Sequence, residues 1–420
     1  GLSMTQEWYK VDNVAKVFLA TNTRRDPRVF RISCTLQEQI DPELLNEALR
    51  VTAPEWPQFQ VTLHRGLFWH YFESTDQLPT CHPEDKAPCA PLYVPERRNR
   101  LIYRVTYFGS RINLEMFHAL TDGNGGFLFL KSIVRNYLAL VHPAEMQDVP
   151  TPNSASAAAL EQDSFRNFYG ATKREGKAPK LPNAYHLRGK RLPYDQLQFF
   201  EGHLSTKEVL ARAHELGVSL TSYLGASLML AIYAEMPALE RSKPIAISLP
   251  VNLRNYYPSE TARNFFNSVY VILTLTETDT MQTAAAAFDA QLKEALLPEN
   301  IKAQMDEYEK LEHVPGIRPV PLVVKNLTVK FFTALEKKHV TAVISNMGRV
   351  TLPDAMKPYI KQFAAFSSCE DLFTCVASYG DDLVLGTASS HRSTNVLRRL
   401  YRGFAEAGLQ VTLYATEVEK

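Results

Sequence analysis

One short stretch of the sequence combines residue types that can move a proton. His118 follows an apolar run typical of a strand, Asp122 comes four residues later, and Gly123, Gly125 and Gly126 precede a second apolar run. Histidine has an ordinary pKa of about 6.5, so it can accept a proton near neutral pH. The stretch therefore predicts a general base at a strand end, with Asp122 fixing the local backbone or the imidazole ring. A hydrogen-bonded histidine beside a tight turn fits the same spacing.

Other catalytic motifs are missing from the sequence. It contains no Walker A loop, GxGxxG fingerprint or HExxH motif, and residues 225–229, around Ser227, lack the last glycine of GxSxG. Cys81, His82 and Cys89 offer three ligands without a CxxC spacing, so we expect no metal site. The odd number of cysteines, 5, does not indicate a disulfide framework and favours a reducing, cytoplasmic environment.

Charge and hydropathy argue against three further classes of protein. The 46 Lys and Arg residues against 45 Asp and Glu give a net charge of +1, which argues against a nucleic-acid partner or a polybasic membrane surface. Residues 125–141 are the most apolar segment, but two basic residues interrupt them, so we expect no membrane span.

Arg24, Arg25 and Arg28 cluster near the N-terminus, either as a solvated face or as contacts to a coenzyme phosphate.

The elements that must position His118 alternate between strands and helices. Period-two patterns predict strands over 29–36, 59–63, 67–73, 101–108, 111–117, 198–204, 245–250, 267–276, 341–345, 372–379 and 383–389. Helical periodicity and capping residues predict helices after Asp41, over 127–138, after Ser205, after Ser219, over 279–297 and over 393–407.

A segment of different composition divides the chain. Residues 143–191 are rich in Ala and Ser, then in Lys, Arg, Gly and Pro, as in a linker. We therefore predict an N-terminal subdomain over 1–145, a crossing linker over 146–195 and a C-terminal subdomain over 196–420. Two similar α/β halves of this kind predict a pseudo-dimer with a ligand-binding cleft between the halves.

Three motifs give the chain a family resemblance. Residues 118–123, His-Ala-Leu-Thr-Asp-Gly, resemble the HxxxDG motif of the chloramphenicol acetyltransferase-like superfamily, which includes alcohol acetyltransferases and the condensation domains of peptide synthetases. Residues 250–254 with 264–267, and Ser-Asn-Met-Gly over 345–348, resemble segments of its alcohol acetyltransferase-like members. The DFGWG motif of many relatives is absent. The resemblance covers nearly the whole chain and implies two-layer α+β halves with a tunnel between them.

The resemblance also implies a mechanism. His118 would remove the proton of an alcohol acceptor, which would attack the thioester of an acyl-coenzyme A, with acetyl expected as the acyl group. No acyl-enzyme and no permanently bound cofactor are expected. Asp122 and Gly123 would hold the histidine loop, with Arg254 as the partner of Asp122; Arg254 can equally be a solvated loop residue.

Because the DFGWG motif is absent, the hydrogen-bond donor that would stabilise the tetrahedral intermediate is unassigned. Ser345 and Asn346 are the candidates, although both can equally close a turn before Gly348. Gly125 and Gly126 offer backbone N–H groups near a helix start, or simply a tight strand-to-helix connection.

Two alternatives remain from the sequence. A condensation-like enzyme would take the acyl group from the phosphopantetheine thioester of a carrier protein and pass it to an amine or hydroxyl. A non-catalytic member would bind an acyl ligand or a partner protein. The intact His118, Asp122 and Gly123 argue against such a loss of catalytic function.

Overall fold

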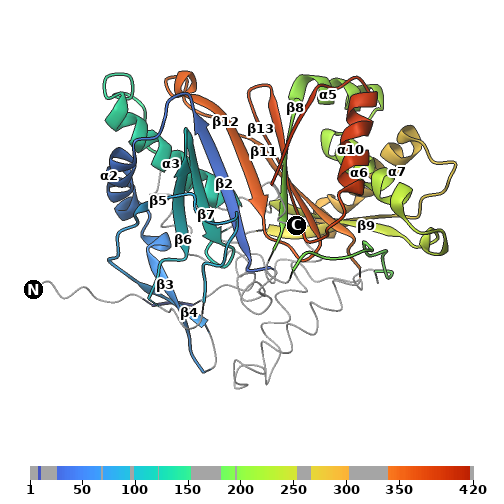
Figure 1. The fold of residues 1–420 in the computed structure, drawn as a ribbon, viewed down its shortest axis with the longest axis horizontal. Coiled ribbons are helices and arrows are strands. Elements are labelled where there is room, and N and C mark those ends of the chain that lie inside the picture. Colours follow the sequence, from blue (N-terminus) through green and yellow to red (C-terminus); the bar gives the residue numbers. More distant parts are fainter. Residues whose placement is uncertain are drawn as a thin grey trace, which may run out of the picture.

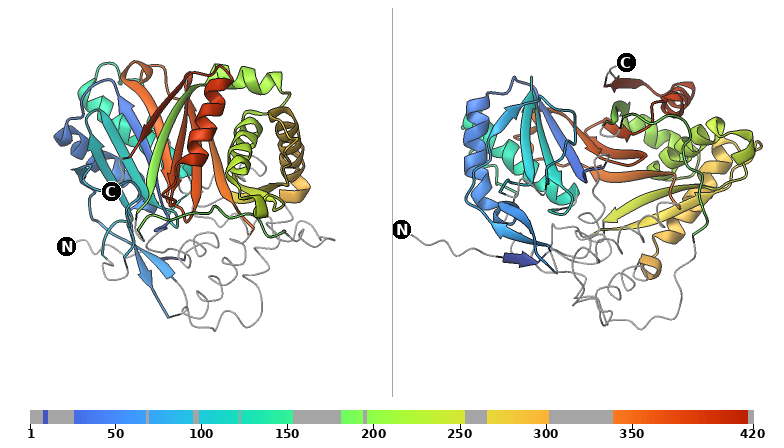
Figure 2. Two further views of the ribbon diagram at one scale, coloured as in Figure 1. Left: turned by 45° about the vertical axis from the view of Figure 1, so that its right-hand side comes forward. Right: turned by 60° about the horizontal axis from the view of Figure 1, so that its bottom comes forward.

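The computed structural model describes residues 8–10, 26–67, 70–94, 99–121, 123–152, 181–193, 196–252, 266–301 and 339–416. Two large sheets stand next to each other at the centre, and helices cover their outer faces (Figures 1 and 2). The predicted α/β class with a two-part layout is confirmed, and the sheets are mixed rather than purely parallel. Among these residues no single helix is long and apolar enough to cross a bilayer.

The sheets differ in size and in strand order. The five-stranded sheet has the order β12 (Ile360–Ser367), β2 (Val29–Leu36), β7 (Arg111–Phe117), β6 (Tyr103–Phe108) and β5 (Cys81–Pro83). The seven-stranded sheet has the order β10 (Phe266–Leu273), β9 (Ile245–Asn252), β11 (Ala342–Arg349), β13 (Leu372–Tyr379), β14 (Asp382–Ser389), β8 (Gln198–Ser205) and β15 (Val411–Ala415). A small third sheet has the order β1 (Trp8–Lys10), β4 (His70–Ser74) and β3 (Val61–Arg65).

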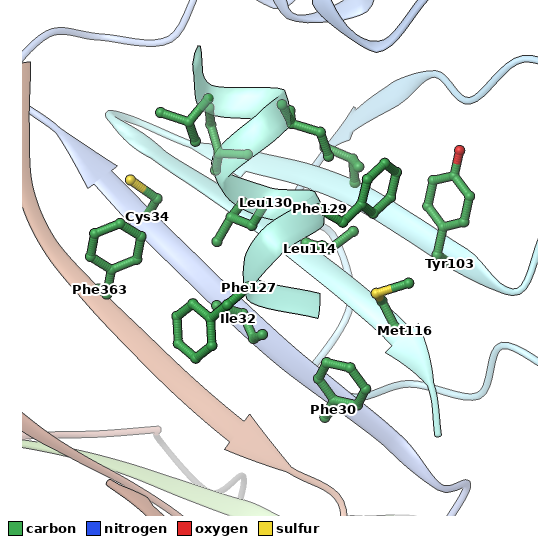
Figure 3. Packing of buried hydrophobic residues seen from close by; sticks show 14 of the residues in the cluster. Phe30, Ile32, Cys34, Tyr103, Leu114, Met116, Phe127, Phe129, Leu130 and Phe363 are labelled. Atoms are coloured by element: carbon green, nitrogen blue, oxygen red, sulfur yellow. The ribbon is translucent and has the colours of Figure 1, made fainter. Parts of the chain in front are cut away.

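Helix α3 (Gly123–Val141) packs on one face of the five-stranded sheet. Alternate residues of β2 point at it, and Phe30, Ile32 and Cys34 meet Phe127 and Leu130 of the helix (Figure 3). Beside α3 lies α2 (Pro42–Thr52), which begins at the predicted cap, because the Asp41 carboxylate accepts the N–H groups of Glu43 and Leu44. This apolar layer fixes the end of β7, where His118 follows.

Among the described residues, the second half contains four α-helices. They are α5 (Thr206–Glu215), α6 (Leu220–Glu235), α7 (Met281–Ala295) and α10 (Asn395–Glu406). The predicted caps Ser205 and Ser219 accept the N–H groups of Glu208 and Ser222. Helix α6 is apolar nearly all round and is sandwiched among α7, α10 and the sheet, which explains its uniform composition.

Strand β12 crosses from the second half of the sequence into the sheet of the first half. It pairs antiparallel with β2, so that Ser367 lies opposite Phe30, and the orange β12 runs beside the blue β2 in Figure 1. Its other face packs against β13 and β14 of the seven-stranded sheet. The sequence patterns did not predict this strand. Because of this crossing, a strand from the second half of the sequence closes the edge of the first-half sheet.

Other local features can be set beside the sequence patterns. Gly109, at φ +58°, turns β6 into β7 as the hairpin pattern predicted. The predicted strand over 341–345 is longer and runs on to Arg349, and β5 and β15 were not predicted. All five cysteines are buried free thiols, and no metal-binding cluster of His, Cys, Asp and Glu occurs among the residues described. Most of the linker, residues 153–180, lies outside the described residues.

Candidate active site

His118 begins the turn that follows β7. Its backbone N–H donates to the carbonyl oxygen of Arg28 (2.8 Å), and the N–H of Leu120 donates back to Phe117 (2.9 Å). The strand therefore ends in a fixed turn. Its pairing with β2 places the imidazole beside Phe30, with ring centroids 4.9 Å apart.

A cavity of about 720 Å³ opens in front of this histidine. Arg28, Phe30 and His118 line it from the first half, and Ser248 and Ser345 line it from the second. A pocket of this size takes a drug-sized molecule. The cleft between two halves that the sequence predicted is thus present, and His118 is half-buried in its wall.

The imidazole is held neutral. Burial, the largest cause, and the positive charge of Arg28 together lower the pKa of His118 to about 3, although Asp26 opposes the shift. At neutral pH the ring therefore has a nitrogen lone pair that can accept a proton. The same environment makes the charged imidazolium expensive to form, so any group that stabilises the added proton matters to the chemistry.

A hydrogen-bonded network ties Asp26, Arg28 and Ser368 together below the ring. The Asp26 carboxylate accepts the hydroxyl of Ser368 (2.6 Å) and the backbone N–H of Arg28 (3.0 Å), and it lies 3.4 Å from Nη1 of Arg28. The Ser368 hydroxyl also accepts the N–H of Val29 (3.0 Å). Arg28 has φ +57°, which is unfavourable for a side chain with a Cβ, so this network holds it there. Its carbonyl, in turn, fixes the backbone of His118.

Ser367, the last residue of β12, reaches the imidazole itself. Its Oγ is 3.3 Å from Nε2 of His118 and 3.1 Å from the carbonyl oxygen of Ser368. Sequence reasoning missed Ser367, Ser368 and Asp26. The available signal was weak: two serines end an apolar run, and nothing local shows that this run pairs with β2.

The position of Arg28 contradicts the prediction that the N-terminal arginines form a solvated face. Its side chain is only 18% exposed and faces the cavity, so it does not belong to a solvated face. Arg24 and Arg25 lie outside the described residues.

Gly123 brings two of the sequence motifs together. A Cβ at this position would lie 2.3 Å from Cε of Met347, so the helix start of the first half meets the Ser-Asn-Met-Gly segment of the second. Gly126 needs its small size more strictly, because a Cβ there would lie 2.7 Å from the rigid ring of Phe30, whereas the flexible end of Met347 can move away from position 123. Gly125 is buried at the same helix start. These glycines allow α3 to begin close to both neighbours.

Ser345 and Asn346 both line the cavity from β11. The amide of Asn346 donates to Oγ1 of Thr221 (2.8 Å) and accepts the N–H of Gly348 (2.9 Å), at a bulge where Gly348 has φ +80°. The segment is therefore a bulge within a strand rather than a turn after it, and the role of either residue in catalysis stays a prediction.

Two predicted site residues cannot be placed. Asp122 and Arg254 lie outside the described residues, so their expected ion pair stays a prediction. Pro250, at the start of the family-like segment, does line the cavity.

Comparison with known proteins gives structural matches only. No family model and no curated protein matches the sequence. Polyketide synthase associated protein 5 from Mycobacterium tuberculosis is 15% identical, with a TM-score of 0.60 over 95% of this chain and 97% of that one. TRI101 from F. graminearum, solved with ethyl coenzyme A, is 11% identical, with a TM-score of 0.65 over 97% and 100%. The first condensation domain of the CDA synthetase is 13% identical, with a TM-score of 0.56 over 97% and 95%.

These matches span both halves of the chain and include coenzyme A-bound and condensation-domain structures. The chain therefore has the chloramphenicol acetyltransferase-like fold, as the resemblance of its motifs predicted.

Proposed function

We propose that the protein is an acyltransferase that moves an acyl group, with acetyl as the first candidate, from coenzyme A to an alcohol, with His118 as the general base. The observation that carries the proposal is a neutral histidine facing a cavity between the two halves. Support comes from similar structures of TRI101 with ethyl coenzyme A and of TRI3, a trichothecene 15-O-acetyltransferase.

The proposed reaction is a direct transfer. His118 takes the proton of the acceptor hydroxyl, and the oxygen attacks the thioester carbonyl carbon. The tetrahedral intermediate then expels coenzyme A as its thiolate, which takes the proton from His118 and leaves as the thiol. Holding both substrates in one cavity supplies the orientation that such a reaction needs, a contribution of roughly 7–11 kcal/mol in well-aligned systems.

Other residues of the chain would position the base and stabilise the oxyanion. The network of Asp26, Arg28 and Ser368 fixes the backbone of the base. Ser345 and Asn346 both line the cavity, but both groups of the Asn346 amide have local partners, so Ser345 is the candidate donor to the oxyanion. Asp122 and Gly123 keep their proposed place in the histidine loop, with Arg254 as the partner of Asp122.

The test measures thiol release from acetyl-coenzyme A with a panel of alcohols and amines. We expect release that depends on an alcohol, is lost in His118→Ala and persists in His82→Ala, which removes an exposed histidine outside the cavity. Equal rates in the His118 variant and the wild type would remove His118 from the base role.

A second candidate donor follows from the match to a condensation domain. Such an enzyme would take the acyl group from a carrier-protein thioester and pass it to an amine or hydroxyl. If coenzyme A thioesters give no release with any acceptor, acyl-loaded carrier proteins are the next substrates to assay. Failure of both donors would favour a non-catalytic, ligand-binding protein.

A further inference from the structure

The inner face of the seven-stranded sheet forms one wall of the cavity, and the character of its side chains changes from strand to strand. Four cavity-lining residues are in register across this wall: Phe373 of β13, Val343 of β11, Ser248 of β9 and Tyr270 of β10. The wall is therefore apolar at β13 and β11, and it carries hydroxyl groups at β9 and β10.

His118 lies on the apolar side of this wall. Gly123, five residues after it, meets Met347 of β11. Ser367, whose hydroxyl reaches the imidazole, ends β12, and β12 packs against β13 and β14. The order of the strands is β10, β9, β11, β13, so β9 is farther from the base than β11.

The register of the strands also gives the distance from the reacting centre to Ser248. Ser248 is the partner of Val343, and Ser345 comes two residues after Val343 on the same face of β11. One strand spacing and two residues along the strand separate Ser345 from Ser248, which is roughly 8 Å. Ser345 is the candidate donor to the oxyanion, so Ser248 lies about this far from the carbonyl group that reacts.

The hydroxyl of Ser248 is buried and has no partner in the protein. Ser248 is 7% exposed, and among the residues that the structure describes no group forms a hydrogen bond with its side chain. Its neighbours in β9, residues 245–247 and 249–251, are all apolar. A ligand that fills the cavity displaces water from this hydroxyl, and a ligand without a matching polar atom leaves it unpaired, which weakens binding.

We propose that Ser248 is a specificity-determining residue for the acceptor, which carries a second oxygen separated by an apolar stretch from the hydroxyl that is acylated. This inference rests on the proposed function and names the class of its acceptor. The apolar stretch lies against Val343 and Phe373, and the second oxygen binds Ser248. A serine hydroxyl both donates and accepts, so a hydroxyl or a carbonyl oxygen fits this place.

Pairs of acceptors that differ by one hydroxyl test this role. An extended six-carbon diol spans about the distance between Ser345 and Ser248, so 1,6-hexanediol is compared with 1-hexanol. The shorter 1,4-butanediol is compared with 1-butanol. The measured quantity is the ratio of kcat/KM for the diol to kcat/KM for the mono-alcohol, with acetyl-coenzyme A as the donor. Because this ratio is compared between protein variants, differences in the intrinsic reactivity of the alcohols cancel.

We expect Ser248→Ala to lower the six-carbon ratio roughly fivefold, the size of one net hydrogen bond, and to leave the four-carbon ratio unchanged. Ser248→Thr and Ser248→Val give side chains of the same shape, and only Ser248→Thr should keep the wild-type ratio. Ser227→Ala is the matched control. Ser227 is also 7% exposed, but its hydroxyl donates to the carbonyl oxygen of Tyr223 (2.7 Å) and it does not line the cavity, so both ratios should stay unchanged.

Equal six-carbon ratios in wild type and Ser248→Ala would overturn the proposal. A raised KM for acetyl-coenzyme A with unchanged ratios would also overturn it, because Ser248 would then contact the donor. If Ser248→Ala does not fold, the comparison of Ser248→Thr with Ser248→Val decides.

Failure of the proposed function gives a different result. If no alcohol releases thiol, acyl transfer to alcohols fails, and ligand-observed NMR then measures the binding of 1,6-hexanediol relative to 1-hexanol. Recognition by Ser248 predicts a relative affinity that is roughly fivefold lower in Ser248→Ala than in wild type. Equal relative affinities would overturn it.

Discussion

Gly386 of β14 lies directly against the backbone of Ala365 in β12. A Cβ atom on Gly386 would come within 1.7 Å of the Ala365 carbonyl oxygen, which is closer than any packing rearrangement of side chains can relieve. The two sheets therefore touch backbone to backbone at this point. Gly386→Ala should force β12 and β14 apart and lower the free energy of unfolding by about 3 kcal/mol or more, measured by urea unfolding.

Gly403 provides the comparison for this variant. It lies inside α10, and a Cβ there would meet nothing within 4 Å. Gly403→Ala should therefore stabilise the protein by about 0.5–1 kcal/mol, through helix propensity alone. Similar unfolding curves for the two variants would contradict the close contact of the sheets.

Ser368→Ala tests the network below the base. The change removes the hydroxyl that donates to Asp26 and accepts the N–H of Val29, so it should cost about 1–3 kcal/mol of stability. It should also lower acyl transfer at least tenfold, because Arg28 and the backbone of His118 lose their fixed position. Ser33 is a buried serine of β2 that donates to Asn113 (2.7 Å) and does not line the cavity, so Ser33→Ala should cost comparable stability without this loss of turnover. Equal turnover in the two variants would show that the network does not position the base.

Acid should destabilise the fold partly through its neutral histidines. Burial lowers the pKa of His118 to about 3 and that of His70 to about 4, while in the unfolded chain both take up a proton near 6.5. As the pH falls below 6.5, the unfolded state binds more protons, and each histidine costs up to about 1.4 kcal/mol per pH unit. Unfolding of His118→Gln between pH 7.5 and 4.5 should show a shallower pH dependence than wild type. Parallel curves would mean that the ring is not held neutral.

His203 should act in the opposite direction at alkaline pH. Burial alone would lower its pKa, but hydrogen bonds to Asp382 (2.9 Å) and Glu201 (2.7 Å) raise it to about 9. The stabilisation is fully present below pH 6.5 and is lost as the pH rises through about 9. Because Glu201 also binds Arg111 across the two sheets (3.0 Å), this loss should loosen their contact. We expect wild type to lose stability between pH 7 and 10 and His203→Gln to lose less, by thermal unfolding.

Features set by neighbouring residues were predictable from the sequence. The cap of α2 by Asp41, the caps Ser205 and Ser219 and the hairpin turn at Gly109 all depend on contacts within a few residues. The position of His118 at a strand end follows from the apolar alternation of β7. Local sequence therefore identified the candidate base and the element that holds it.

The parts of the site that depend on long-range strand pairing were not predictable from the sequence. Ser367 and Ser368 reach the site because β12 pairs with β2, and nothing in the sequence of β12 indicates that partner. Arg31 is a second example, since a charged residue in an alternating strand normally points to water. It is 2% exposed and pairs with Glu84 (2.6 Å), because the face that carries it is covered rather than solvated.

The crossing of β12 also sets the order in which the protein can be completed during synthesis. Roughly 320 residues separate β2 from the strand that covers its edge, and ribosomes add about 5–20 residues per second. For roughly 16–65 s, therefore, the nascent first half displays an open strand edge to every other chain nearby. The residue that contacts the base is made only at the end of that interval, so a prematurely terminated chain carries His118 but neither a closed sheet nor a finished site.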